Sequence, residues 1–374
     1  MNFNAMCSTE IVFTGLAEAQ NRLLHCEAQH VVFIASAGAV ERWKMNSFVS
    51  NWKKKCKLTW LSSRISCPTQ QDILEALIKI DEEKPDLIVA IGGGSAIDLA
   101  KAISAFHGLK EIRSLKKITE AIESGVYQKQ KDGIDIIAVP STAGTGAEIT
   151  QWATIWDVNQ RNKFSIDAKF LKPKLAMFIP ELTITMPDKV TLSTGLDALA
   201  HAIEAFWAKK TNPMVQNFAG SAIQSIVGEL GKTLNDLDNI LYRENMCAAS
   251  LQAALAFSQT RTTACHSISY PMTLHYKIPH GLAVAITLPV VAELNKGSFK
   301  NDDILESFFA DYGSIQKWLD CVSDKFVRLR LRNFGIHKSD IKFLAEQAFT
   351  VGRMDNNPVA FDKNDIRDIL LKVF

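Results

Sequence analysis

The chain has 374 residues, of which 47% are hydrophobic and 22% charged, and its formal net charge is +2. This length allows two ordinary domains, and the composition is that of a globular protein rather than a disordered or fibrous one. The basic residues are dispersed along the sequence, which argues against a nucleic-acid-binding surface.

Targeting signals and cysteine pairs are not evident. The first residues lack a basic segment followed by a long apolar segment, so no signal peptide is expected. No run reaches the ~18 uninterrupted apolar residues that a membrane span requires. The seven cysteines are scattered without a CxxC pair, which is typical of reduced thiols. We therefore expect a soluble, cytoplasmic protein with no membrane or nucleic-acid partner.

The first half alternates short β-rich runs with amphipathic stretches. Strands are predicted at 31–35, 58–61, 86–91 and 134–139, and helices at 39–55, from Thr69 to about residue 83, and directly after the glycines at 92–94. Strands that alternate with helices indicate a parallel sheet covered by helices on both faces.

The second half changes character after Pro180 and Pro187. Helical patterns cover 193–209, 213–237 and 242–258, with further helices from 302 to the end. Alanine is frequent and strong helix breakers are sparse, so an all-α bundle is predicted. We expect an α/β domain over residues 1–187 and a helical domain over 188–374.

A glycine turn follows the predicted strand at 86–91. Gly92, Gly93, Gly94 and Ser95 lead from this strand into a helix. The absence of Cβ atoms lets a pyrophosphate approach the backbone, and the helix N-terminus favours an anion. The sequence lacks the GxGxxG fingerprint, and the alternative is a tight strand–helix turn without a ligand.

A second small-residue loop follows the strand at 134–139. It reads Pro-Ser-Thr-Ala-Gly-Thr-Gly-Ala-Glu over residues 140–148 and is rich in hydroxyls and glycines. Two such loops at the carboxyl ends of strands in one sheet match the usual position of a ligand cleft in open α/β folds. A nucleotide site therefore becomes the better interpretation.

Candidate metal ligands lie in the helical half. Asp197 and His201 are four residues apart in an apolar helical pattern and share one helix face. A buried carboxylate there needs a partner, which a private Asp–His hydrogen bond could also provide. His266 and His280 follow later in the same half. One carboxylate and three imidazoles could hold a divalent metal and leave room for a substrate oxygen. Spacing alone leaves His275 open as another ligand.

Taken together, these motifs resemble the iron-dependent (group III) alcohol dehydrogenases. The resemblance rests on Gly-Gly-Gly-Ser with Asp98 and Lys101, the loop at 140–148, Gly-Leu-Asp-Ala-Leu-Ala-His and Pro-His-Gly, in that order, and it covers nearly the whole chain. It implies the iron alcohol dehydrogenase architecture shared with dehydroquinate synthase, namely a dinucleotide-binding α/β domain followed by a helical metal-binding domain. It also implies an enzyme that interconverts an aldehyde and an alcohol with NADP or NAD and Fe²⁺. Zn²⁺ is possible because raw affinity favours it. A homodimer is also expected.

The resemblance assigns residues to both sites. The implied metal ligands are Asp197, His201, His266 and His280, and His275 is not among them. The implied cofactor-binding residues are Ser36, Gly93, Gly94, Ser95, Asp98, Ser141, Thr142, Thr145 and Lys163.

Three departures from the family pattern bear on specificity. Ser36 replaces an acidic residue that disfavours NADP in many members, so NADP should be accepted. Tyr270 replaces a histidine suspected of proton relay, which leaves that role open. The segment 257–263, Phe-Ser-Gln-Thr-Arg-Thr-Thr, replaces a glycine-rich run.

The last departure resembles a narrower group, the phosphonoacetaldehyde reductases, which produce 2-hydroxyethylphosphonate. Arg261 in this segment could bind a phosphonate through a bidentate contact. Alternatively, it is a structural arginine that pairs with a carboxylate or caps a helix. The remaining alternatives are a general dehydrogenase of neutral aldehydes, a dehydroquinate synthase-like cyclase and a non-enzymatic nucleotide sensor. The Asp–His pair and Arg261 argue against the cyclase, and the intact metal ligands argue against the sensor.

Overall fold

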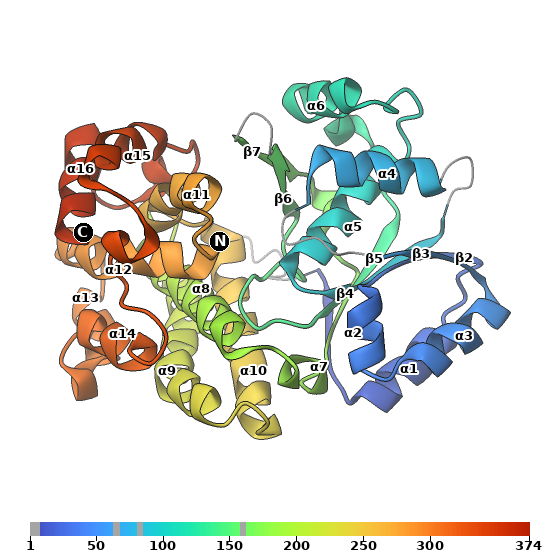
Figure 1. Ribbon diagram of the computed structural model, residues 1–374, viewed down its shortest axis with the longest axis horizontal. Coiled ribbons are helices and arrows are strands. Elements are labelled where there is room, and N and C mark those ends of the chain that lie inside the picture. Colours follow the sequence, from blue (N-terminus) through green and yellow to red (C-terminus); the bar gives the residue numbers. More distant parts are fainter. Residues whose placement is uncertain (1–7, 63–67, 81–84, 158–161) are drawn as a thin grey trace. The chain divides into compact units, whose positions relative to one another are not determined.

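The computed structural model describes residues 8–62, 68–80, 85–157 and 162–374. It divides into two compact units, coloured blue to green and green to red in Figure 1. The first unit spans Met1–Thr142 and Ala147–Thr185, and the second spans Ala143–Gly146 and Met186–Phe374. The loop Ala143–Gly146 thus groups with the helical unit, although it lies within the first 187 residues.

The first unit is built on a six-stranded parallel sheet. Its strands are β1 (Glu10–Phe13), β2 (His30–Ile34), β3 (Lys57–Leu61), β4 (Leu87–Gly92), β5 (Asp135–Pro140) and β8 (Leu175–Phe178), in the spatial order β1-β8-β5-β4-β2-β3. All five residues of β2 are buried. Val31 and Phe33 join one apolar core, and Val32 and Ile34 join the other. Both faces of the sheet are therefore covered, as an all-parallel sheet requires.

Helices supply the cover on each face. Residues of α1 (Leu16–Leu24), α2 (Ala37–Arg42), α3 (Asn46–Lys55) and α7 (Glu181–Ile184) belong to one core, and residues of α4 (Gln70–Ile80), α5 (Gly94–Phe106) and α6 (Leu115–Ser124) to the other. A hairpin of β6 (Trp152–Asp157) and β7 (Asn162–Asp167) also packs into the second core. The short 3₁₀ helices are η1 (Val126–Lys129), η2 (Lys169–Leu171), η3 (Ala310–Tyr312), η4 (Leu331–Phe334), η5 (Lys338–Asp340) and η6 (Met354–Asn356).

The four predicted strands are confirmed to within one residue at either end. The single helix predicted at 39–55 is wrong, because the chain breaks into α2 and α3. Lys44 lies between them with φ 54°, a left-handed conformation that a continuing helix excludes. The described part of the helix predicted from Thr69 is α4 (Gln70–Ile80), and its expected end at residue 83 lies outside the described residues.

The strand order places a topological switch point between β2 and β4. From β2 the chain proceeds to β3 on one side, whereas from β4 it proceeds to β5 on the other. The helices that follow β2 and β4 therefore leave on opposite faces of the sheet. Open α/β sheets bind ligands at the carboxyl ends of the strands at such a point.

The second unit is a helical bundle, as predicted. Its helices are α8 (Asp188–Trp207), α9 (Pro213–Asn235), α10 (Ile240–Thr260), α11 (Ala264–Tyr276), α12 (His280–Asn295), α13 (Asp302–Ser307), α14 (Ile315–Ser323), α15 (Ile341–Gln347) and α16 (Lys363–Lys372). Helix α8 packs against α9, α10, α11 and α12, and 16 of its residues are buried. Polar side chains on α8 therefore lie inside the bundle. Within the described residues, no helix is both long enough and apolar enough to cross a membrane.

Candidate active site

Three polar side chains of α8 lie inside the helical bundle. Asp197, His201 and Glu204 are 5%, 6% and 0% exposed. Their spacing of four and three residues places them along one helix face. A carboxylate or imidazole so deeply buried requires specific partners, and these come from α11 and α12.

The carboxylate of Asp197 is the point on which three imidazoles converge. Its Oδ1 lies 3.4 Å from Nε2 of His266, 3.8 Å from Nε2 of His280 and 3.9 Å from Nε2 of His201. Neither Asp197 Oδ1 nor His266 Nε2 has a hydrogen-bond partner among the described residues, and both atoms are buried. Ligand atoms about 2.1 Å from a tetrahedral divalent ion are about 3.4 Å apart. Asp197, His201 and His266 form a metal-capable cluster, and the donor set with its two orphaned atoms fits a divalent metal.

His280 reaches the cluster because of a close helix contact. It is the first residue of α12, and Gly281 follows it. A Cβ at Gly281 would lie 1.8 Å from the backbone oxygen of Ser193 and 3.0 Å from Cβ of Asp197. Only glycine lets α12 begin this close to α8. The spacing of the predicted ligands in sequence gave no indication of this contact.

His201 is held by groups on two sides. Its Nδ1 lies 3.1 Å from the carbonyl oxygen of Gly144, and its ring stacks on Phe257 with centroids 4.0 Å apart. Donation of the Nδ1 proton to this carbonyl leaves Nε2 as the lone-pair atom facing Asp197. A Cβ at Gly144 would lie 2.3 Å from the backbone oxygen of Thr194, so glycine is needed here too.

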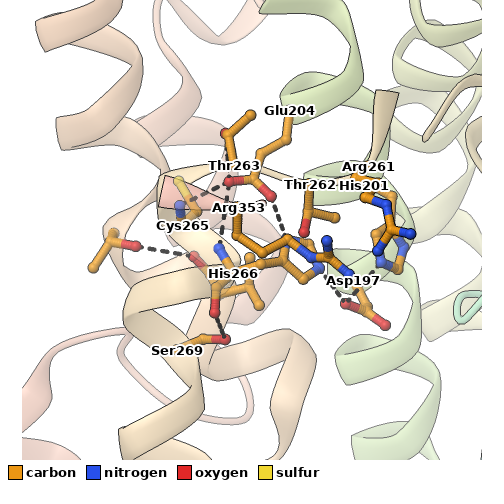
Figure 2. Close-up of polar contacts among 12 residues, drawn as sticks. Asp197, His201, Glu204, Arg261, Thr262, Thr263, Cys265, His266, Ser269 and Arg353 are labelled. Atoms are coloured by element: carbon orange, nitrogen blue, oxygen red, sulfur yellow. Dashed lines mark hydrogen bonds and ion pairs between the residues drawn. The ribbon is translucent and has the colours of Figure 1, made fainter. Parts of the chain in front are cut away.

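Glu204 is a buried residue bonded to His266 that the sequence motifs did not predict. Its Oε1 accepts hydrogen bonds from the Thr263 hydroxyl and from the backbone N–H groups of Cys265 and His266. Its Oε2 accepts from Nδ1 of His266 (Figure 2). This arrangement directs the Nε2 lone pair of His266 toward Asp197. Its position three residues after His201, in a stretch that is otherwise apolar, was the signal available in the sequence.

The charges in the cluster shift each other's pKa values. Burial raises the pKa of Asp197, but the neighbouring imidazoles outweigh burial and hold that pKa well below its usual range. Burial also lowers the pKa of His201 to about 4. Burial lowers the pKa of His266 as well, but the Glu204 carboxylate outweighs it and the net shift is upward. Asp197 is therefore ionised and His201 neutral at neutral pH, as metal ligation requires, whereas His266 has to release a proton before it can bind a metal.

Arg261 follows α10 at the margin of this cluster. It is the C-cap of α10 and has φ 65°, a left-handed conformation that is rare for a residue other than glycine. Such strain often occurs at functional sites. Burial lowers the pKa of Arg261, the nearby Arg353 lowers it further, and Tyr270 opposes these effects. Tyr270 in turn stacks on the ring of His280 with centroids 5.8 Å apart. His275 lies in the last turn of α11 against Phe343. Among the described residues, the metal-capable cluster of Asp197, His201 and His266 includes neither His275 nor His280, but Nε2 of His280 lies 3.8 Å from Oδ1 of Asp197.

A separate pocket occupies the switch point of the first unit. It has a volume of about 310 Å³ and is lined by Ser36, Ala39, Arg42, Trp43, Ile91, Gly92, Gly93, Ser95, Ala96 and Ser141. Four predicted cofactor-binding residues thus share one pocket. Ser36 caps α2 by accepting from the N–H of Ala39. Arg42 is a positively charged residue of the pocket that motif analysis missed.

The other predicted cofactor-binding residues have different surroundings. Gly94 is the first residue of α5, and Thr142 lies next to Gly93, where its buried hydroxyl has no hydrogen-bond partner among the described residues. Thr145 belongs to the loop Ala143–Gly146 in the helical unit. Asp98 accepts from the N–H of Thr154 in β6, and Lys163 lies in β7. Asp98 and Lys163 are not among the lining residues of the pocket, and their cofactor role stays a prediction.

Two family models match the two parts of the chain. Residues 8–180 match the model for "Iron-containing alcohol dehydrogenase", and residues 191–374 match "Fe-containing alcohol dehydrogenase family, C-terminal". The chain belongs to the iron-containing alcohol dehydrogenase family. It is therefore an iron-type, NAD(P)-dependent alcohol dehydrogenase that acts on a small alcohol or aldehyde, as the resemblance implied.

Individual relatives of this alcohol dehydrogenase differ in cofactor and substrate. The NAD-dependent methanol dehydrogenase of Bacillus methanolicus is 30% identical over 315 residues, covering 81% of each chain. The NADPH-dependent butanol dehydrogenase of Clostridium saccharobutylicum is 29% identical over 327 residues, covering 82% of this chain and 81% of the relative. The crystal structure of sulfoacetaldehyde reductase from Bifidobacterium kashiwanohense in complex with NAD⁺ superimposes with a TM-score of 0.85 at 25% identity, covering 100% and 99% of the two chains. The family thus fixes the reaction class, whereas the substrate depends on residues of the individual chain.

Proposed function

We propose that this alcohol dehydrogenase reduces phosphonoacetaldehyde to 2-hydroxyethylphosphonate with NAD(P)H. Asp197, His201, His266 and His280 are the proposed metal ligands. The observation that carries the substrate assignment is the position of Arg261, which lies beside His201 at the margin of the ligand cluster (Figure 2) and has a left-handed backbone conformation. A guanidinium there can bind an anionic tetrahedral group through two parallel hydrogen bonds.

The protein's own groups prepare the site for this reaction. Glu204 and the carbonyl of Gly144 orient His266 and His201 so that both present Nε2 toward Asp197. A divalent metal held there supplies Lewis acidity toward a carbonyl oxygen. The buried apolar side chains of α8, α11 and α12 limit access of water to Asp197, His201 and His266, whereas His280 is 34% exposed. Arg261 binds the anionic end of the substrate and thereby sets the position of its aldehyde end.

The pocket at the switch point is the proposed cofactor site. A pyrophosphate there would meet the glycine turn and the N-terminus of α5, which starts at Gly94. Ser36 has no charge to repel a 2′-phosphate, and Arg42 lines the same pocket. We therefore expect NADPH to be used at least as well as NADH.

A sulfonate substrate is the second candidate. Sulfoacetaldehyde, the substrate named for the reductase of similar fold, is also a two-carbon aldehyde that carries an anionic tetrahedral group. Arg261 suits both substrates, since each offers oxygens that can accept its N–H groups. A neutral aldehyde would make no use of this contact.

An aldehyde panel tests the proposal. The enzyme, reconstituted with iron or zinc, is assayed with phosphonoacetaldehyde, sulfoacetaldehyde and propanal, each with NADH and NADPH. A charge-assisted hydrogen bond contributes about 1.5–3 kcal/mol, so Arg261→Ala should lower kcat/KM about 10- to 150-fold for phosphonoacetaldehyde. The loss with propanal should be small. Equal losses on both substrates would mean that Arg261 is structural, and a wild-type preference for propanal would refute the substrate assignment.

A further inference from the structure

Arg353 is a second buried arginine beside the ligand cluster. It lies directly before η6 and is 8% exposed. Figure 2 shows its side chain with Arg261 and Thr262 beside Asp197, His201 and His266. Because the residue lies far from these motifs in sequence, nothing in the spacing of the ligands predicted it.

The segment that carries Arg353 is fixed to the active-site helices. The side-chain amide of Asn356 donates to the carbonyl oxygens of Thr260 and Thr262, on both sides of Arg261. On the other side of Arg353, the N–H of Thr350 donates to the hydroxyl of Ser267, the residue after His266. These bonds fix the segment that carries Arg353 next to the loop that carries Arg261.

The guanidinium of Arg353 is buried but forms few hydrogen bonds with the protein. A guanidinium carries five N–H donors. Among the described residues, the only hydrogen bond that this one donates is from Nη1 to the carbonyl oxygen of its neighbour Gly352, at 3.2 Å. The nearby hydroxyl of Thr262 is also buried and has no hydrogen-bond partner in the described part of the chain. Burial of a charge costs several kcal/mol unless it is paired.

Arg261 and Arg353 also repel each other. Arg353 is among the charges that lower the pKa of Arg261, after burial. For the buried Arg353, a second positive charge nearby adds to the cost of burial, and an anion between the two guanidiniums would offset both the repulsion and that cost. The neighbouring hydroxyl of Thr262 adds a hydrogen-bonding group of the kind that phosphate-type oxygens accept from.

We propose that Arg353 is a substrate-binding residue that, together with Arg261 and the hydroxyl of Thr262, binds a doubly charged phosphonate. This inference rests on the proposed function and refines it. A phosphate-type group carries about −1.5 to −2 charges at pH 7, whereas a sulfonate carries one. Two guanidiniums therefore match a phosphonate in charge, and they leave one positive charge uncompensated with a sulfonate. The arginine pair favours phosphonoacetaldehyde over sulfoacetaldehyde.

The test compares Arg353→Met with Arg353→Lys and with the control Arg330→Met. Arg330 is a half-buried arginine of the same unit that donates to Gln316 and to the carbonyl of Leu329. Arg353→Met should raise KM and lower kcat/KM about 10- to 150-fold for phosphonoacetaldehyde, with a smaller loss for sulfoacetaldehyde and less than about 3-fold for propanal. Arg353→Lys should fall between wild type and Arg353→Met, and Arg330→Met should match wild type.

Binding of ethylphosphonate and ethanesulfonate, measured by calorimetry on the metal-loaded enzyme, provides a readout without turnover. Wild type should bind ethylphosphonate more tightly, and Arg353→Met should lose most of this difference. If wild type prefers propanal, the proposed function fails. The anion site is tested separately, because it exists only if Arg353→Met loses ethylphosphonate binding. Equal losses on all three aldehydes, unchanged ethylphosphonate binding or a loss confined to NADPH binding would overturn the assignment of Arg353. Where Arg353→Met fails to fold, Arg353→Lys carries the same comparison.

Discussion

Replacement of Glu204 by glutamine tests whether this carboxylate sets the metal affinity of the site. Its two oxygens accept four hydrogen bonds, three at Oε1 and the one from His266 Nδ1 at Oε2. Glutamine has the same shape but only one acceptor oxygen. The amide oxygen should take the Oε1 position, because an NH₂ group there would face three donors. The NH₂ group then faces Nδ1 of His266.

This geometry reverses the tautomer that the metal requires. With a donor opposite Nδ1, His266 is stabilised with its proton on Nε2, the atom that faces Asp197. In this tautomer Nε2 has no lone pair to offer a metal. If the proton moves back to Nδ1, the Nδ1–H group and the NH₂ group of the glutamine face each other as two donors. Loss of such an outer partner typically costs about 10- to 100-fold in metal affinity, equivalent to about 1.4–2.7 kcal/mol. We expect Glu204→Gln to weaken metal binding within this range.

The measurement is competition for Zn²⁺ or Co²⁺ against a chromophoric chelator, with NADPH binding followed by fluorescence. NADPH binding should be nearly unchanged, since the proposed cofactor pocket is formed by other residues. The control is Glu229→Gln, which changes a partly buried carboxylate bonded to Lys232 and Asn245 on the same bundle. Metal affinity within about 2-fold of wild type in Glu204→Gln would refute the reasoning, as would an equal loss in the control.

The remaining predictions concern ligands, helix contact and cofactor. His280→Ala should abolish turnover and lower metal content measured by atomic emission, whereas His275→Ala should be mild; the reverse order would overturn the ligand assignment. Gly281→Ala should lower metal content and destabilise the fold by about 1–3 kcal/mol in denaturant unfolding, because its Cβ would meet the Ser193 backbone at 1.8 Å; a stable, metal-replete variant would contradict this. Ser36→Asp should shift the NADPH/NADH ratio of kcat/KM toward NADH by about 10-fold or more through like-charge repulsion beside the pocket, and a wild-type enzyme that rejects NADPH would count against the whole cofactor argument.

Sequence patterns predicted the central strands well because buried parallel strands are continuous apolar runs. Short peripheral elements carried less signal: β1 and β8 are four residues each, and the hairpin β6–β7 lies outside the main sheet. The break at Lys44 was missed because a single left-handed residue leaves the helical periodicity around it almost intact.

The active site was predictable where its residues share one local element. Helical spacing predicts that Asp197 and His201 share one helix face. Glu204 continues the same face, although it was not among the predicted site residues. The place of Arg353 near the site could not be predicted from the sequence, because it depends on tertiary hydrogen bonds between Asn356 and the loop after α10. The approach of His280 likewise depends on the contact at Gly281 between two helices.

The grouping of Ala143–Gly146 with the helical bundle has a consequence for dissecting the protein. The polypeptide passes from one unit to the other three times, at 142/143, 146/147 and 185/186. A fragment cut at residue 186 would lack Gly144, whose carbonyl orients His201, and Gly146, which packs against Phe257 and Ala254. The helical half is thus not a transplantable module. A chimera that exchanges it between relatives has to carry these four residues along, or His201 on α8 loses its orienting partner.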